Sequence, residues 1–154
     1  MDQIIPHLYI CNWQVSNNID EIKRNNIKAV LTIETQPKPV KVTDYYRKNN
    51  IDFLYLRLED LPQANISQYF DISYDFIDAH VSRKQNVVLH CWAGVSRSAT
   101  LVMNYILKKI IMQRRNELIC VKCLLDNVLK YMRSKRPIVN PNTGFKNQIL
   151  KYYE

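Results

Sequence analysis

The segment VVLHCWAGVSRSAT, residues 87–100, decides the fold. It begins as a short apolar run, which is typical of a strand buried on both faces of a parallel sheet. Cys91 follows that run directly, Arg97 comes six residues later, and a helical pattern begins at Ser98. This order predicts a loop whose backbone amides curl around one tetrahedral anion at the positive end of a helix.

The residue types in this loop suit phosphoryl chemistry. Gly94 supplies the positive φ or the close approach that such a curl requires, and Arg97 offers a planar fork for two phosphate oxygens. In that positive field Cys91 is expected to ionise, and a thiolate facing a bound phosphate is a nucleophile for phosphoryl transfer. We therefore expect the loop to bind phosphate through six residues: Trp92, Ala93, Gly94, Val95, Ser96 and Arg97.

The rest of the chain alternates strand and helix patterns. Short apolar runs predict strands over residues 8–11, 28–33, 53–58 and 86–90. Apolar residues at helical spacing predict helices over residues 66–81, 98–109 and 117–133. Strands that alternate with helices, followed by a run of helices, indicate an α/β fold with a short, mostly parallel central sheet flanked by helices.

Length and composition favour one domain. The chain has 154 residues, 47% of them apolar, and no linker or repeat divides it, so we expect a single domain over 1–154. No segment approaches the ~18 apolar residues that a membrane span needs, and the start of the chain lacks a secretory leader. Four cysteines without such a leader indicate thiol chemistry in a reducing compartment. We expect a cytoplasmic protein, with the nucleus as the alternative.

The net charge of +8 is concentrated in the last third of the chain. Residues 1–104 contain 11 Lys and Arg against 11 Asp and Glu, whereas residues 105–154 contain 11 against 3. Such a surface attracts anions, but a solvated helical face accounts for it equally well. The charge pattern alone leaves both interpretations open.

Four blocks of the sequence carry a family resemblance. HCWAGVSRS (90–98) resembles the signature of cysteine-dependent protein phosphatases, and in particular of the dual-specificity branch. LYIC (8–11) is similar to the family's first strand, RLEDLPQANISQYF (57–70) to its general-acid loop, and RPIVNPNTGFKNQI (136–149) to its C-terminal segment. The resemblance spans nearly the whole chain. It implies an enzyme that hydrolyses phosphotyrosine and phosphoserine or phosphothreonine through a phosphocysteine, with no metal or other cofactor.

The resemblance also implies roles for individual residues. Cys91 matches the nucleophile, Arg97 the phosphate-binding arginine, and Ser98 the hydroxyl that assists breakdown of the phosphocysteine. Asp60 lies 31 residues before Cys91, where the family keeps its general acid. Glu59 is the neighbouring candidate, but the Asp of this pair is the family's acid.

Two further positions match supporting residues of the family. His90 matches the histidine that orients the loop and favours the thiolate, and Asn142 matches a residue that braces the loop from outside. Trp92 stands where the family varies freely, so it either lines the rim of the pocket or packs against a neighbour. Cys11 stands where the family commonly has Gly. The segment 105–136 is longer than usual, which leaves the pairing of its helices open.

Other cysteine and histidine patterns have simpler interpretations. Cys120 and Cys123 resemble a redox CxxC motif, but the helical pattern predicts them in the middle of a helix, beside its apolar stripe. Without a helix N-terminus to activate them, core packing is the favoured interpretation. His7 and His80 are too far apart in the sequence to suggest a metal site.

The loop residues distinguish this function from three rivals. An RNA 5′-phosphatase would suit the basic last third, but such relatives usually carry Asn and Thr where this chain has Ser96 and Ser98. A phosphoinositide phosphatase would be expected to carry lysines in residues 92–96, which contain none. A phosphoprotein-binding module usually lacks the nucleophile or the arginine, and both are present. Phosphorylated proteins are therefore the expected partners and nucleic acid the less favoured one, while the oligomeric state stays open.

Overall fold

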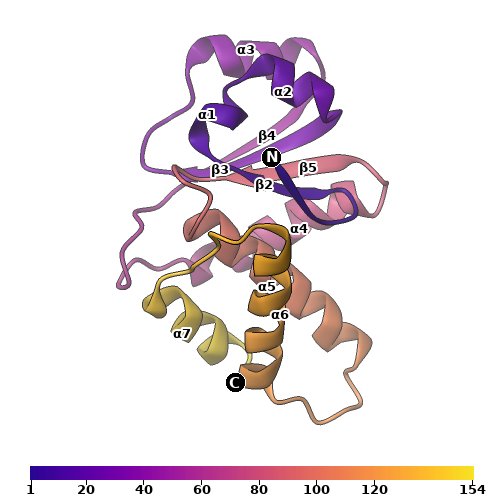
Figure 1. Cartoon of the computed structure of the whole chain (residues 1–154), viewed down its shortest axis with the longest axis vertical. Coiled ribbons are helices and arrows are strands. Elements are labelled where there is room, and N and C mark those ends of the chain that lie inside the picture. The colour runs from indigo at the N-terminus through magenta and orange to yellow at the C-terminus, as the bar shows by residue number, and fades with distance from the viewer.

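A five-stranded sheet runs through the middle of the computed structural model, which covers residues 1–154, and helices lie on both of its faces (Figure 1). The strands, in chain order, are β1 Asp2–Ile5, β2 Leu8–Cys11, β3 Ile27–Glu34, β4 Asp52–Arg57 and β5 Asn86–His90. Their order across the sheet is β1-β2-β5-β3-β4, and only β1 is antiparallel to its neighbour. The predicted fold class is confirmed, although β1 was not predicted.

Seven α-helices and one 3₁₀ turn complete the chain. They are α1 Trp13–Ser16, α2 Ile19–Arg24, α3 Val40–Lys48, the 3₁₀ turn η1 Ser67–Tyr69, α4 Phe70–Val81, α5 Arg97–Gln113, α6 Val121–Lys135 and α7 Thr143–Tyr152. Helices α1 to α3 cover one face of the sheet and α4 to α7 the other (Figure 1). None of these helices combines the length and the apolar character needed to cross a lipid bilayer.

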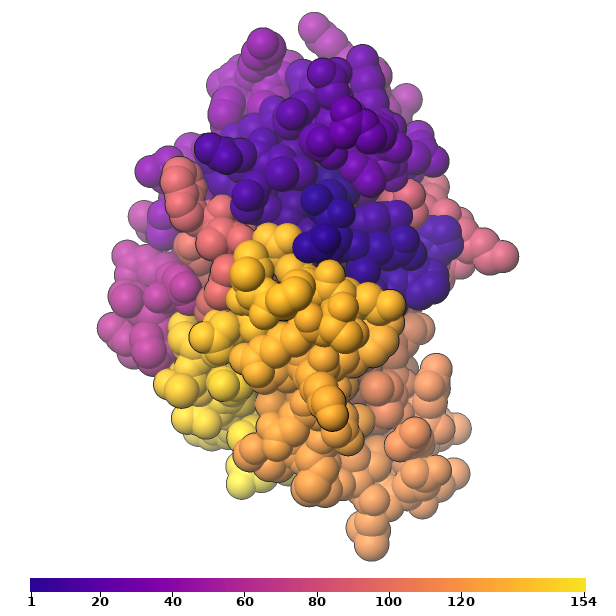
Figure 2. Space-filling model, viewed as in Figure 1, coloured from indigo at the N-terminus to yellow at the C-terminus, as the bar shows by residue number.

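Most of the apolar burial lies on the side of α4 to α7. One cluster of 29 buried residues includes side chains of the sheet and of these helices, whereas the cluster that includes residues of α2 and α3 has 8. At the centre, Val87, Val88 and Leu89 of β5 are fully buried, as the uniform apolar run predicts. The C-terminal part of the chain, orange in Figure 2, lies against the indigo N-terminal segment. Tyr131 of α6 donates a hydrogen bond to the carbonyl of Ile4 (2.8 Å).

The predicted helix over residues 117–133 is wrong at its start. Helix α6 begins only at Val121, and Leu118, which the pattern assigned to the buried stripe, is fully exposed. Cys120 caps the helix and Cys123 lies in its first turn, and both are exposed. The prediction that these two cysteines pack in the core is therefore wrong. The residues before Cys120 belong to the loop that follows α5, and the first buried residue of α6 is Leu125.

The long segment between residues 105 and 136 has a simple organisation. Helix α5 continues to Gln113, a loop follows, and α6 returns along it. Helix α5 contacts α4, α6 and α7, which settles the helix pairing that the sequence left open.

The topology brings distant parts of the chain to one edge of the sheet. Strands β2, β5, β3 and β4 are parallel, so their carboxyl ends lie along the same edge. In sheets of this kind the loops at that edge form the ligand crevice. The residues that end these strands or follow them directly are Cys11, Glu34, Leu58 and Cys91.

Truncation of Leu31 in the central part of β3 tests the importance of this core. Leu31 is fully buried, so Leu31→Ala should lower the free energy of unfolding by about 2–5 kcal/mol, measured by urea denaturation. Val40→Ala, at a position 72% exposed, is the matched control and should cost less than about 1 kcal/mol. Equal losses in the two variants would contradict this assignment of the core.

Candidate active site

Cys91 lies directly after β5, at the start of a tight loop that leads into α5. Its side chain is buried, and its Sγ lies 3.3 Å from Oγ of Ser98 in the first turn of α5. A hydroxyl at this distance can donate a hydrogen bond to a thiolate, and bonds to a charged acceptor are stronger than neutral ones. The structure thus brings the predicted nucleophile and the predicted assisting hydroxyl into contact.

The backbone of residues 91–97, here called the phosphate loop, turns its carbonyl groups outward. Each carbonyl from residue 92 to residue 96 accepts a hydrogen bond from a group outside the loop. The Trp92 carbonyl accepts from the Trp13 amide, and the carbonyls of Ala93 and Gly94 accept from the Arg136 guanidinium. The Val95 carbonyl accepts from the Asn140 amide, and the Ser96 carbonyl accepts from the Thr100 amide. None of the amides of residues 92–97 donates to a protein group. Six donors without a protein acceptor in one loop are the arrangement that an anion-binding loop needs.

Arg136 and Gly94 hold the loop in this shape. Gly94 has a φ of +68°, and a Cβ atom there would lie 2.5 Å from the carbonyl oxygen of Cys11 and 2.6 Å from a guanidinium nitrogen of Arg136. Arg136 is buried, donates to the carbonyls of Ala93 and Gly94, and pairs with Asp2 at 2.8 Å. The conformation and the close approach that the sequence predicts for Gly94 are both confirmed.

Arg97 is oriented by a buried carboxylate. Its two terminal nitrogens donate to the two carboxylate oxygens of Glu34 (2.9 and 3.1 Å), and one of them also donates to the carbonyl of Leu58. Its Nε is buried and has no partner. A buried N–H without an acceptor is costly, so Nε is a donor available to a phosphate oxygen.

His90 supports the loop from the sheet side as a neutral imidazole. Burial, with the nearby charges of Lys38 and Arg97, holds its pKa well below the usual value. Its Nδ1 lies 3.0 Å from the Cys91 carbonyl, which only accepts, so this nitrogen carries the proton. Its Nε2 then accepts from the hydroxyl of Thr32 at 2.6 Å.

The two predicted residues outside the phosphate loop also meet. Nδ2 of Asn142 donates to Oδ1 of Asp60 (3.0 Å), while Oδ1 of Asn142 accepts from the amide of Phe145 and so caps α7. The backbone amide of Asn142 donates to Oγ of Ser96 (3.0 Å). Asn142 thus joins the segment that carries Asp60, the N-terminus of α7 and the phosphate loop, and its contact with the loop runs through its backbone.

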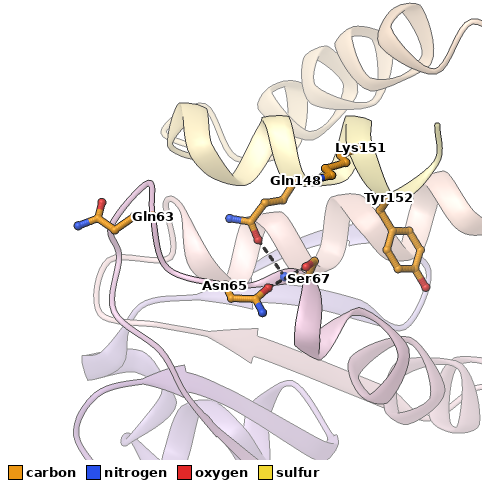
Figure 3. A pocket seen from close by; sticks show the side chains of 6 residues that line it. All are labelled: Gln63, Asn65, Ser67, Gln148, Lys151 and Tyr152. Carbon is orange, nitrogen blue, oxygen red and sulfur yellow. Dashed lines mark hydrogen bonds between the residues drawn. The ribbon is translucent and has the colours of Figure 1, made fainter.

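The segment of residues 58–66, here called the acid loop, is fixed against α7. The side chain of Gln148 accepts from the amide of Ser67 (3.1 Å) and donates to the carbonyl of Ala64 (2.8 Å). These groups belong to a shallow polar depression of about 430 Å³ (Figure 3). Because Gln148 is occupied by backbone partners, we interpret this depression as the anchor of the acid loop and not as a second reaction site. Gly144 allows the close packing, since a Cβ there would lie 2.0 Å from the Pro62 carbonyl oxygen.

An open cleft of about 560 Å³ lies over Arg97. It is lined by Glu34, Thr35, Gln36, Glu59, Asp60, Leu61, Trp92 and Arg97. The Trp92 side chain is 59% exposed at its rim and stacks on Trp13 with ring centroids 6.0 Å apart, so both interpretations given for Trp92 hold. The cleft thus unites the predicted arginine and general acid from distant parts of the chain.

Comparison with known proteins agrees with this geometry. The family model for the dual specificity phosphatase catalytic domain matches residues 8–154. The chain belongs to the dual specificity phosphatase family. Dual specificity protein phosphatase 1 of Arabidopsis thaliana is 31% identical over 142 residues, which are 92% of this chain and 63% of that protein. Dual specificity protein phosphatase 22-B of Danio rerio is 30% identical, over 99% of this chain and 73% of its own length.

Solved structures of the family superpose well. The crystal structure of DUSP15 aligns with a TM-score of 0.78 at 27% identity, over 97% of this chain and 85% of that one. The Yvh1 phosphatase domain from Chaetomium thermophilum has a TM-score of 0.86 at 23% identity, over 99% and 94% of the two chains, and shows the shared fold. The chain spans less than two thirds of several relatives, for example 57% of dual specificity protein phosphatase 15 of Mus musculus.

Three residues of the site were missed by the sequence analysis: Glu34, Thr32 and Arg136. Glu34 carries a detectable signal, since a carboxylate that ends an apolar strand and becomes buried needs a cationic partner. Arg136 stands in the last of the four blocks that resemble the family, residues 136–149. Its place in the sequence does not indicate that it contacts carbonyls more than 40 residues away. No group of three or more His, Cys, Asp or Glu side chains in the structure is arranged to hold a metal ion.

Replacement of Asn142 should separate its capping from its contact with Asp60. Asn142→Asp keeps the oxygen that caps α7 but loses the donor to Asp60 and adds a like charge, so kcat for phosphate esters should fall several-fold, to about tenfold. Inhibition by inorganic phosphate should change little, because the loop amides remain. Asn142→Ala should also lower the free energy of unfolding, by about 1 kcal/mol. An unchanged kcat in both variants would show that this contact does not position Asp60.

Acid should destabilise the fold through His90. Its pKa is lowered in the folded state, so the unfolded chain binds the proton more readily, and stability should fall as the pH drops below ~6.5. One such group contributes at most about 1.4 kcal/mol per pH unit. Urea denaturation from pH 7 to pH 5 should show a smaller slope for His90→Asn than for the wild type.

Proposed function

We propose that this chain is a metal-independent protein phosphatase that hydrolyses phosphotyrosine and phosphoserine or phosphothreonine esters through a phosphocysteine. The observation that carries the proposal is the phosphate loop, in which the six amides of residues 92–97 have no protein acceptor while the five carbonyls of residues 92–96 accept from groups outside the loop. A dianionic phosphate monoester satisfies these donors, and it brings its phosphorus atom to the sulfur.

In the first half-reaction the Cys91 thiolate attacks phosphorus in line with the ester oxygen. The loop amides and Nε of Arg97 stabilise the negative charge on the equatorial oxygens. Asp60 protonates the departing side-chain oxygen, so the product leaves as a neutral alcohol or phenol. The position of Asp60 in the same cleft as Arg97 supports this assignment.

In the second half-reaction Asp60, now a carboxylate, removes a proton from the attacking water. Oγ of Ser98 donates to Sγ of Cys91 as the sulfur leaves with the negative charge. The products are inorganic phosphate and the regenerated thiolate. Both half-reactions use one set of residues: Cys91, Arg97, Asp60 and Ser98.

The shape of the cleft supports a broad choice of phosphorylated side chain. The cleft is open, and a short acid loop forms one wall of it. No additional recognition loop deepens it, so the shorter serine and threonine esters reach Cys91 as well as the tyrosine ester does. Since Cys91 works only as a free thiol, a reducing compartment, the cytoplasm or the nucleus, suits this chemistry.

The basic last third of the chain gives less support to RNA as a substrate than its charge suggests. Lys108, Lys109 and Lys122 pair with Asp71, Asp78 and Asp126, respectively. Arg133 donates to the Val139 carbonyl, and Arg136 holds the phosphate loop. Five of the eleven basic side chains of residues 105–154 are thus engaged by groups of the protein itself, and phosphorylated proteins remain the proposed substrates.

Substitution of Cys91 and Asp60 tests the mechanism. Cys91→Ser should abolish turnover yet retain binding of phosphate, because a hydroxyl does not ionise at neutral pH. Asp60→Asn should slow alkyl phosphates by about 10²-fold or more and aryl phosphates with good leaving groups far less. It should also flatten the basic limb of the bell-shaped profile of kcat/KM against pH. Equal rates of wild type and Asp60→Asn on both ester classes would assign the proton to another residue.

Parallel assays on a phosphotyrosine peptide, a phosphothreonine peptide and 5′-triphosphorylated RNA test the substrate class. We expect hydrolysis of both peptides, little release of phosphate from RNA, and a modest effect of salt. If RNA were the substrate through ~6 phosphate contacts, affinity would fall on the order of 10³-fold between 50 and 200 mM salt. Efficient RNA hydrolysis with that salt dependence would overturn the proposed substrate class.

A further inference from the structure

Two exposed cysteines meet at the start of α6, far from the phosphate loop. Sγ of Cys120 and Sγ of Cys123 lie 2.6 Å apart, closer than two unbonded sulfur atoms normally approach. The loop that joins α5 to α6 lies at the end of the molecule opposite the sheet (Figure 1). The pair is therefore a thiol site separate from Cys91, and the phosphatase mechanism does not use it.

The helix N-terminus acts on one of these sulfurs more than on the other. Cys120 is the N-cap residue, and its Sγ accepts from the backbone amide of Cys123 (3.3 Å). The contacts with the thiol and the backbone amide of Cys123 lower the pKa of Cys120, whereas the contact with Cys120 raises the pKa of Cys123. Asp126 raises both values, but it is paired with Lys122 at 2.7 Å. Cys120, whose sulfur accepts the amide at the start of the helix, is thus the better thiolate of the pair.

Access distinguishes this pair from the other two cysteines. Cys120 and Cys123 are exposed, and so is the loop before them, including the fully exposed Leu118. Cys11 is 1% exposed, and burial raises its pKa to about 12. A small reagent in solution therefore reaches the CxxC pair directly and Cys11 hardly at all.

We propose that Cys120 and Cys123 form a redox-active dithiol that exchanges with small-molecule disulfides such as oxidised glutathione. The Cys120 thiolate attacks one sulfur of the small disulfide, which breaks the S–S bond and releases one small thiolate. Cys123, once deprotonated, attacks the Cys120 sulfur of this mixed disulfide and releases the second small thiolate. The protein dithiol loses two electrons and two protons, and one small disulfide becomes two small thiols.

The spacing favours ring closure over accumulation of the mixed disulfide. Cys123 lies three residues after Cys120, on the same side of the first helical turn, and their sulfurs are already in contact. The second attack is intramolecular and needs no rearrangement of the core, because neither side chain is buried. Reduced glutathione reverses both steps, so the pair responds to the ratio of small disulfide to small thiol.

The test uses the full chain with Cys91→Ser, so that the catalytic thiol does not react. After treatment with oxidised glutathione at neutral pH and alkylation of the remaining thiols, peptide mass spectrometry should find a Cys120–Cys123 disulfide and an alkylated Cys11. Reduced glutathione should restore both thiols. Oxidation of Cys11 at the same rate, or glutathione left on both exposed cysteines without a link between them, would overturn the proposal.

Single substitutions test the order of attack. With Cys123→Ser, the glutathione adduct on Cys120 should accumulate because no second thiol resolves it. With Cys120→Ser, the adduct on Cys123 should form more slowly, on the order of tenfold, because the better thiolate is gone. Serine is a good N-cap residue, so Cys120→Ser should retain α6, which circular dichroism checks. Faster reaction at Cys123 than at Cys120 would contradict the assigned roles.

Discussion

The outward direction of five consecutive carbonyl groups is the constraint on which the rest of the site depends. A loop can gather six amides around one anion only if the carbonyls between them find donors elsewhere, since a buried carbonyl without a donor is costly. Here those donors come from three separate parts of the chain, through Trp13, Thr100, Arg136 and Asn140. Helix α1, helix α5 and the segment after α6 are therefore parts of one support for the phosphate loop.

Charge is balanced around this loop so that an anion is still attracted. Arg97 is buried against Glu34, which avoids an isolated buried charge and fixes the plane of the guanidinium while leaving Nε free. His90 is neutral, so it orients the loop without adding a charge. Lys38 is buried with only neutral oxygens of Ser16 and Asn17 as partners, and burial lowers its pKa to about 7. In the proposed function these side chains position the loop, and its free amides face the phosphate.

Local patterns predicted the elements well where burial follows a simple period. The strands at residues 8–11 and 86–90 and the helix at α4 agree closely with the sequence, because their apolar residues alone decide which face is buried. The start of α6 was predicted wrongly because Leu118 fits the helical period but is exposed, and the helix capped by Cys120 begins at Val121, four residues later than expected. A sulfur that caps a helix is not among the usual N-cap signals, so the sequence pattern could not reveal it.

The sequence by itself determined the strand, loop and helix of residues 87–100, because the five residues between Cys91 and Arg97 must join a buried strand to a helix and Gly94 supplies the positive φ. It also determined, through the four family blocks, which residues to look for. Only the tertiary structure decided that Glu34 orients Arg97, that Arg136 holds the loop carbonyls, and that Asn142 reaches Asp60 across 82 residues. These contacts join residues that no local period relates, because they depend on how parallel strands bring their carboxyl ends to one edge and on how α7 packs against the acid loop.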